Sequence, residues 1–413
     1  MMKWIKLALR NIFRNRRRSF TTIIAIAVGF ASISLYYGYI HHTYWAVRFF
    51  AVHGEGLGHL RINKEGWKNN SKLDKLKYMF SYDETQKIMK LVNEEKNVIL
   101  STPQLYLSGL VSNGTTSTYF VAEGVVPKDD KIIKNQRWIN YAKVQGKPLS
   151  EDTPSGVEIS SGLGKQLNLA PGKDGVAMTT TLDGQMKALD VKVTAVFNTG
   201  NDFYNDKYMR FNFNYAQSLL DTQSAERIVV LLDDIQATEK MRKHLLRKLS
   251  VAGINCEIQT WDELSVAYTK IKSYLDAIFI FLFSIILIIV AMTTINTMSM
   301  VILERTNEIG TLRALGLKRK GVSMIFALEG AFLGLFGSIL GIVLHSCVVA
   351  ITRYHKTYYT PPGSSSSVSL YVDMVPDMLA VLFFSFILLS SLSAVVSARR
   401  AGKKNIVDAL GHV

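Results

Sequence analysis

The stretch ERTNEIGTLRALGLKRK, residues 304–320, is a charged segment that lies between two long apolar runs of the chain. Within it, Ile309, Leu312 and Leu315 recur at the spacing of one helix face, and Gly316 stands where a helix would end. A simple turn between two apolar runs does not need so regular a pattern. Two interpretations are open on these grounds: an amphipathic turn at a membrane surface, or a short helix on which another protein acts.

The apolar runs themselves predict a membrane protein. There are four of them, and each reaches the roughly 20 residues that a helix needs to cross a hydrocarbon core about 30 Å thick. Buried helices of a soluble protein are the alternative, but uncharged runs of this length are rare in soluble folds. The first run ends in tyrosines instead of a small-residue cleavage site, so we expect an uncleaved anchor. The expected spans are residues 19–42, 274–303, 321–351 and 377–398.

The net charge of +15 first suggests nucleic acid as a partner, but its distribution indicates a membrane topology instead. Basic residues concentrate in residues 1–18, 304–320 and 399–413, next to the apolar runs. Short basic segments mark the cytoplasmic side of a membrane. We therefore expect these segments and both termini in the cytoplasm, with residues 1–18 as an amphipathic helix. The long segment 43–273 and the loop 352–376 are expected outside, and no nucleic acid is expected to bind.

The segment 43–273 has the pattern of an α+β domain. Turn signals such as Asn113-Gly114 separate pairs of predicted strands. Residues 227–261 read as a strand, a helix and a second strand, and a mostly β insertion is expected at about residues 125–215. From Trp261 onward the pattern predicts one helix that runs directly into the second span.

Motifs for catalysis are absent from the sequence. It contains no phosphate-binding loop, no H-E-x-x-H or C-x-x-C pattern and no G-x-S-x-G elbow. We therefore predict that the chain is not an enzyme and that it holds no metal or cofactor of its own. In the third apolar run, Glu329 is an acid that needs a partner, because an intramembrane carboxylate is costly. Glycines at a four-residue spacing suit close helix packing within the chain or between two copies: Gly330, Gly334, Gly337 and Gly341.

Three segments carry a family resemblance. The pattern E-R-x-x-E-I-G-x-L-R-A-x-G runs from Glu304 to Gly316 and is followed by the glycine-rich run. Residues 7–31 resemble an N-terminal amphipathic helix followed by a first span, and residues 397–410 resemble the C-terminal tail of the same class of protein. In that tail, Ile406 stands where a proline is usual. Together they resemble the MacB/LolC/LolE/FtsX class of ABC-transporter permeases over essentially the whole chain.

The resemblance implies a multi-pass protein of the bacterial inner membrane with both termini in the cytoplasm. Its fold would be four transmembrane α-helices, one plus three, with a two-lobed α+β periplasmic domain after the first. ATP and magnesium would be bound by a separate dimer of ATPase subunits, and a second permease, a copy or a paralogue, would complete the complex among membrane lipids. Residues 304–320 would be the coupling helix. The residues expected to contact the ATPase are Glu304, Arg305, Glu308, Ile309, Gly310, Arg313 and Gly316.

The resemblance also implies how such a chain would work. In this class, ATP-driven closure moves the outer domain through long helices, and no substrate need cross the membrane. Residues 156–180 and 193–220 resemble the LolC/LolE branch, which implies release of lipoproteins from the inner membrane. Two alternatives stay open: MacB-like efflux of peptides or small molecules in a tripartite pump with a periplasmic or outer-membrane partner, and FtsX-like transmission of force to a cell-wall hydrolase.

Overall fold

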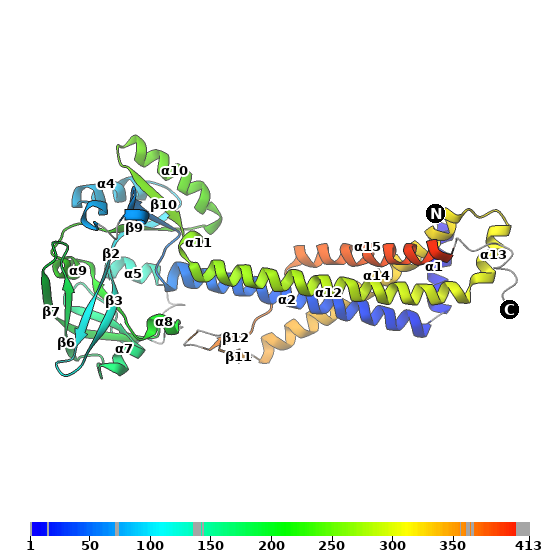
Figure 1. The fold of residues 1–413 in the computed structure, drawn as a ribbon, viewed down its shortest axis with the longest axis horizontal. Helices are drawn as coiled ribbons and strands as arrows, with labels where there is room; N and C mark the ends of the chain where they lie inside the picture. Colours follow the sequence, from blue (N-terminus) through cyan, green and yellow to red (C-terminus); the bar gives the residue numbers. More distant parts are fainter. Residues whose placement is uncertain are drawn as a thin grey trace. The chain divides into compact units, whose positions relative to one another are not determined.

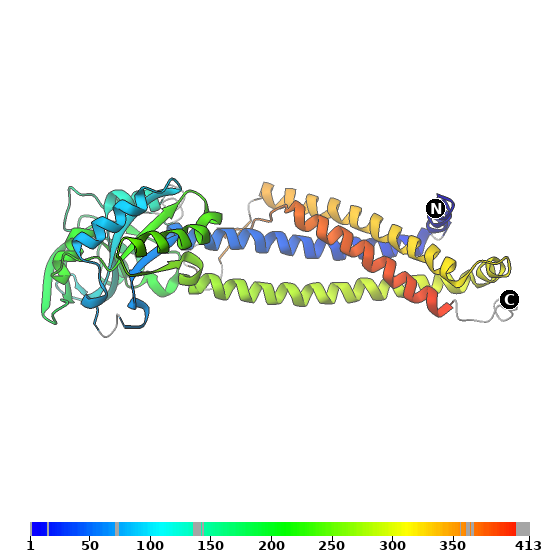
Figure 2. The same ribbon diagram turned by 90° about the horizontal axis from the view of Figure 1, so that it is seen from above.

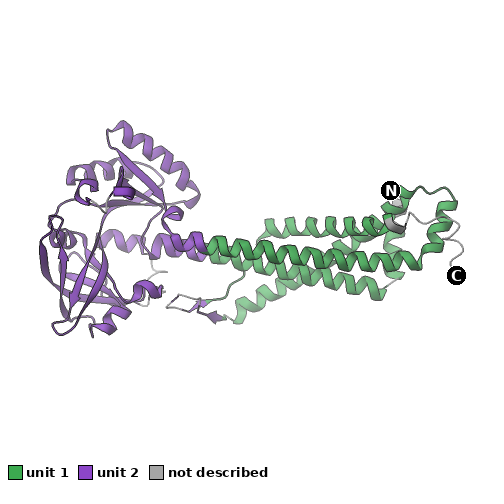
Figure 3. Ribbon diagram, viewed as in Figure 1, with its two compact units in different colours: residues 1–44, 271–357, 369–413 green, residues 45–270, 358–368 purple. Residues whose placement is uncertain are grey.

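The computed structural model describes residues 2–14, 16–70, 74–134, 142, 144–355, 357–360, 364 and 367–401. The predicted tail beyond Ala401, including Ile406, and parts of the loop 352–376 lie outside these residues. The chain divides into two compact units, shown in two colours in Figure 3. We call them the helical unit, residues 1–44, 271–357 and 369–413, and the sheet unit, residues 45–270 and 358–368.

The helical unit is built on long apolar helices that run side by side in both ribbon views (Figure 1 and Figure 2). Within the described chain, four helices are long and apolar enough to cross a membrane, as the sequence predicts. Phe30 and Phe386 meet edge to face at their centre, with ring centroids 5.6 Å apart. The helices of this unit are α1 Met2–Arg14, α2 Arg16–Phe49, α12 Val266–Glu304, α13 Thr306–Ala314, α14 Arg319–His355 and α15 Pro376–Ala401.

The helix expected to run without interruption from Trp261 is in fact broken. A short helix α11, Trp261–Leu264, ends at Ser265, which has an extended backbone with ψ 90°. The Ser265 hydroxyl oxygen accepts a hydrogen bond from the Tyr268 backbone N–H at 3.3 Å, which is how an N-cap residue starts a new helix. The prediction of one helix from Trp261 was therefore wrong at its start, and the unbroken helix begins at Val266.

The described residues of the sheet unit form a sheet of ten strands. Strand β2 lies between β9, which continues to β1 and β10, and β3, which continues to β8, β5, β7 and β4. The first part of β2 pairs with β9, from Val98 to Gln104, and the second part pairs with β3 from Leu105 onward. The strands are β1 Leu60–Lys64, β2 Val98–Ser112, β3 Ser117–Val125, β4 Gln145–Gly146, β5 Gly156–Ser160, β6 Asp174–Thr180, β7 Met186–Phe197, β8 Tyr208–Asn212, β9 Arg227–Leu232 and β10 Cys256–Thr260.

Short helices and turns connect these strands. The π-helical turn η1, Phe50–Gly54, directly follows α2, and the 3-10 turn η3, Ile235–Ala237, follows β9. The helices are α3 Trp67–Asn70, α4 Tyr82–Asn93, α5 Pro127–Ile133, α7 Ser161–Gln166, α8 Asp202–Asn205, α9 Phe213–Leu220 and α10 Thr238–Val251. Remaining short elements are η2 Leu76–Tyr78, β11 Tyr358–Tyr359 and β12 Val368–Ser369.

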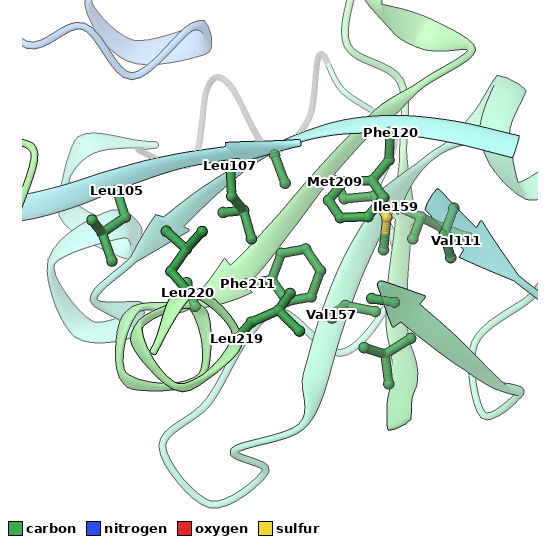
Figure 4. Packing of buried hydrophobic residues seen from close by; sticks show 14 of the residues in the cluster. Leu105, Leu107, Val111, Phe120, Val157, Ile159, Met209, Phe211, Leu219 and Leu220 are labelled. Carbon is green, nitrogen blue, oxygen red and sulfur yellow. The ribbon is translucent and has the colours of Figure 1, made fainter. Parts of the chain in front are cut away.

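Two apolar cores cover different parts of the sheet. Leu245 and Leu249 of α10 pack with Ile88 of α4 against β1 and β9. In the other core, Leu107, Phe120, Phe211 and Val157 point toward one another between β2, β3, β8 and β5 (Figure 4). The pairing of β1 with both β9 and β10 confirms the predicted strand–helix–strand unit.

The β-rich insertion expected at about residues 125–215 stays a prediction. The core around Phe120 and Phe211 also includes Leu105 of β2, so it reaches into the chain before residue 125. The reason is the hairpin at Asn113-Gly114, which is confirmed: Ser112 pairs with Ser117, so β3 folds back onto the same sheet. The division of this domain into two lobes stays a prediction.

Candidate functional site

Helix α13 lies near α1 at one end of the helical unit (Figure 1). Gly316 has a φ of +95°, a left-handed conformation that glycine adopts without strain. The Gly316 and Leu317 backbone N–H groups donate to the carbonyls of Arg313 and Leu312, each at 3.0 Å, and so close the helix. The predicted helix over residues 304–320 is therefore shorter, because Glu304 ends α12 and Arg319 begins α14.

A buried polar cluster attaches the start of α13 to two other helices. Arg305 Nη1 donates to Glu329 Oε1 of α14 at 3.0 Å. Asn11 Nδ2 of α1 donates to the same oxygen at 2.6 Å. Arg305 is 8% exposed and Glu329 2%. The carboxylate that the sequence placed in an apolar run thus has both a charged and a neutral donor, as a buried charge requires.

Two ion pairs at the surface join α13 and the end of α12 to the N-terminal part of the chain. Arg14 Nη2 lies 2.8 Å from Glu308 Oε1, and Arg18 pairs with Glu304. Arg305 Nε donates to Glu308 Oε2 at 2.9 Å. Partial burial raises the pKa of Glu308, but the hydrogen bonds from Arg305 and Arg14 outweigh this and hold the pKa below its ordinary value. Glu308 is therefore ionised at neutral pH and links α1 to α13.

The two faces of α13 differ in what they can offer to a partner. Arg305 and Gly310 are buried within the chain, and Ile309 packs partly buried against the apolar core of the helical unit. By contrast, Leu315 is 81% exposed and Leu312 37%. Both Arg305 and Gly310 face inward in this chain, and their contact with an ATPase stays a prediction. The outward face presents leucines instead.

The four predicted packing glycines of α14 contact two different helices of this chain. A Cβ on Gly330 would lie 2.5 Å from the Ser390 carbonyl oxygen of α15, and one on Gly334 would lie 2.8 Å from Ile387 Cα. On Gly337 and Gly341 a Cβ would lie 2.5 Å and 2.8 Å from side-chain atoms of Ile26 and Phe30 in α2. The glycines therefore form a packing seam inside the chain.

Sequence reasoning missed Asn11, and it counted Arg14 and Arg18 only among the basic residues before the first span. They lie about 300 residues away from their partners in the chain, at separations of 318 for Asn11–Glu329 and 294 for Arg14–Glu308. The one available signal was Glu329, since an intramembrane acid demands a donor. No local pattern indicates which helix supplies that donor.

Two family models match the chain. Residues 19–248, more than half of it, match the MacB-like periplasmic core domain, and residues 279–406 match the FtsX-like permease C-terminal region. The chain therefore belongs to the family of ABC-transporter permeases that combine these two parts.

Relatives in this family carry several roles. An uncharacterized ABC transporter permease of Methanocaldococcus jannaschii is 26% identical over 232 residues, 55% of this chain and 56% of the relative. The cell division protein FtsX of Streptococcus pneumoniae is 30% identical over 36% of this chain and 48% of its own. The lipoprotein-releasing system transmembrane protein LolC of Neisseria meningitidis is 30% identical over 34% of this chain and 37% of its own. The chain thus spans about half the length of these curated relatives or less.

Proposed function

We propose that this chain is the non-catalytic membrane subunit of an ABC transporter, in which α13 receives movement from a separate ATPase. The observation that carries the proposal is the arrangement of α13: its outward face presents Leu312 and Leu315, and Arg305 fixes its other side to Glu329. An exposed leucine pair next to charged side chains suits a contact with another protein. ATP and magnesium would be bound by the ATPase dimer.

The ion pairs around α13 support the transmission of that movement. Glu329 and Glu308 connect α13 to α14 and α1, and Arg18 connects the end of α12 to the start of α2. A push on α13 would therefore act on several long helices together. Both α2 and α12 continue without a break past the residues where the chain enters the sheet unit. We propose that these two helices pass the movement to the domain between them, with both termini in the cytoplasm of a bacterium and the domain outside its inner membrane.

For the substrate we propose a lipoprotein that is released from the inner membrane, with a second permease completing the complex. The relationship to LolC supports this branch. The relationship to FtsX, at the same 30% identity, supports the alternative of force transmission to a cell-wall hydrolase. The MacB-like domain supports efflux of peptides or small molecules as a further alternative.

The coupling proposal is tested with Leu315→Asp in the complex with the ATPase. Burial of one leucine side chain is worth roughly 1.5–3 kcal/mol, so we expect the affinity for the ATPase to fall by about 10- to 100-fold. ATPase stimulation should fall in parallel. Val251→Asp is the matched control, because Val251 is 90% exposed at the end of α10 in the sheet unit. If Leu315→Asp binds and stimulates the ATPase like the control, α13 is not the coupling element.

The substrate is tested separately, by identifying what co-purifies with the full chain in mild detergent. A bound lipoprotein would support release from the membrane. An adaptor protein of an efflux pump, or a cell-wall hydrolase, would replace that proposal with the corresponding alternative.

A further inference from the structure

A groove of about 360 Å³ lies in the sheet unit, between the end of α2, the turn η1 and the end of β9. One side of it is a row of rings. Trp45 and Phe49 are stacked with centroids 5.6 Å apart, and His53 follows at 4.8 Å from Phe49. His59 continues the row, perpendicular to His53 at 6.5 Å. The volume falls within the range of about 300–1,000 Å³ that is typical of ligand pockets, and π-helical turns such as η1 often occur at functional sites.

Two carboxylates line the same groove directly after β9. Asp233 accepts hydrogen bonds from Asn97 Nδ2 at 3.2 and 3.3 Å, and Asp234 accepts from the Gln236 backbone N–H at 2.9 Å. Both side chains are exposed, and these donors are neutral. Among the described residues, neither acid has a cation within ion-pair distance. Their negative charge is therefore available to a ligand.

A cation also lines the groove without neutralising these acids. Arg48 is partly buried on α2, and within the described part of the chain it makes no ion pair. Arg48 and the two carboxylates line the same groove without pairing with each other, so a ligand that carries a positive and a negative group can contact both. An arginine guanidinium binds phosphate oxygens well, because its donors match their geometry.

The histidines of the row add no positive charge. The Leu232 backbone N–H donates to His59 Nδ1 at 3.0 Å, which leaves the ring proton on Nε2. Burial and the neighbouring His53 lower the pKa of His59 to about 4. His53 Nδ1 lies 2.7 Å from the Ile133 carbonyl oxygen, to which it donates. The row therefore adds no positive charge. Its stacked members turn their faces toward one another, so the row gives the groove an uncharged wall beside the two carboxylates.

We propose that this groove binds phosphoethanolamine chemistry: an ammonium held by Asp233 and Asp234 beside the uncharged ring row, joined to a phosphate held by Arg48. The source is either the headgroup of a phospholipid or a soluble phosphoethanolamine. A headgroup is within reach along the chain, because Arg48 follows the expected end of the first span, residue 42, in the same helix α2. Six residues of helix rise by about 9 Å, which is comparable with the headgroup layer of about 5–8 Å on each side of a bilayer.

The test measures lipid binding to the full-length protein in detergent by native mass spectrometry. Phosphatidylethanolamine is compared with phosphatidylglycerol, which has the phosphate but no ammonium. We expect at least about tenfold preference for phosphatidylethanolamine. We expect that preference to be lost in the double variant Asp233→Asn with Asp234→Asn, and binding itself to weaken by about tenfold in Arg48→Gln. Asparagine keeps the turn contact of Asp234, so the fold is retained.

Asp174→Asn and Arg247→Gln are the matched controls, since both residues are exposed elsewhere in the sheet unit. Equal binding of the two lipids, or equal losses in groove variants and controls, would overturn the proposal. If the double variant does not fold, Arg48→Gln decides alone. Soluble phosphoethanolamine is titrated in parallel by calorimetry: binding as tight as that of the lipid identifies a soluble ligand, and binding of the lipid alone identifies the headgroup. No ATPase is needed, so the result is independent of the coupling proposal.

Discussion

The buried pair of Arg305 and Glu329 gives the sharpest prediction for the role of α13. Arg305→Met removes the charged donor but keeps a side chain of similar length. Glu329, 2% exposed, then keeps only Asn11 as a donor. Breaking a buried ion pair from one side costs about 3–5 kcal/mol, because it leaves an uncompensated charge. At about 2 °C per kcal/mol for a protein of this size, we expect a fall in apparent Tm of about 6–10 °C.

The double variant Arg305→Met with Glu329→Leu is expected to recover most of that loss. Replacing both members of a buried pair by apolar groups is often close to neutral, since no charge remains buried. The coupling energy between the two positions should therefore be about 2–3 kcal/mol. Recovery of stability would show that the pair acts within the chain and does not reach toward a partner.

The assay follows thermal loss of the monodisperse peak of the full chain in mild detergent by fluorescence-detected size exclusion. The single variants, the double variant and wild type are measured at the same detergent and salt concentrations. Additive losses, with the double variant as unstable as the sum of the single variants, would refute the reasoning. So would a single variant with an unchanged Tm, because a buried 3.0 Å ion pair cannot be broken without cost.

Three further outcomes are expected. Gly330→Ala should lower the free energy of unfolding by roughly 1–3 kcal/mol and with it the Tm, because the added Cβ meets a backbone oxygen of α15 at 2.5 Å. Gly321→Ala is the control, since its Cβ meets only the movable Leu317 side chain. Equal Tm values for the two variants would contradict this. Arg14→Gln should cost less than about 1 kcal/mol, since its pair with Glu308 is exposed, and a larger loss in the same thermal assay would be inconsistent with that geometry. Between pH 6.5 and 4 the unfolded chain protonates His59 while the folded protein does not, so the free energy of unfolding falls as the pH drops. At pH 4 this decrease is of order 3 kcal/mol, and it should be absent in His59→Gln. Parallel pH–stability curves of variant and wild type would disprove this.

Local sequence predicted those elements whose cause is local. Hydropathy over about 20 residues predicted the four long helices, because a helix in lipid must be apolar along its length. The Asn113-Gly114 turn predicted a hairpin, and Gly316 predicted the end of α13. The turn and the helix end both rest on the backbone preferences of a few neighbouring residues. The start of α12 was misplaced, because the cap at Ser265 competes with a helical pattern that continues on both sides of it.

Only the tertiary structure decided which side of α13 faces outward. The sequence places Arg305 and Leu315 in one short charged segment and does not distinguish which faces inward, yet the first is buried and the second is exposed. That difference depends on Glu329 and Asn11, which approach α13 from helices far apart in the chain. The groove has the same origin, because Arg48 and Asp233 line one surface only after β9 has paired into the sheet. Periodicity along the chain carries no information on such contacts, since they depend on how distant helices and strands pack together.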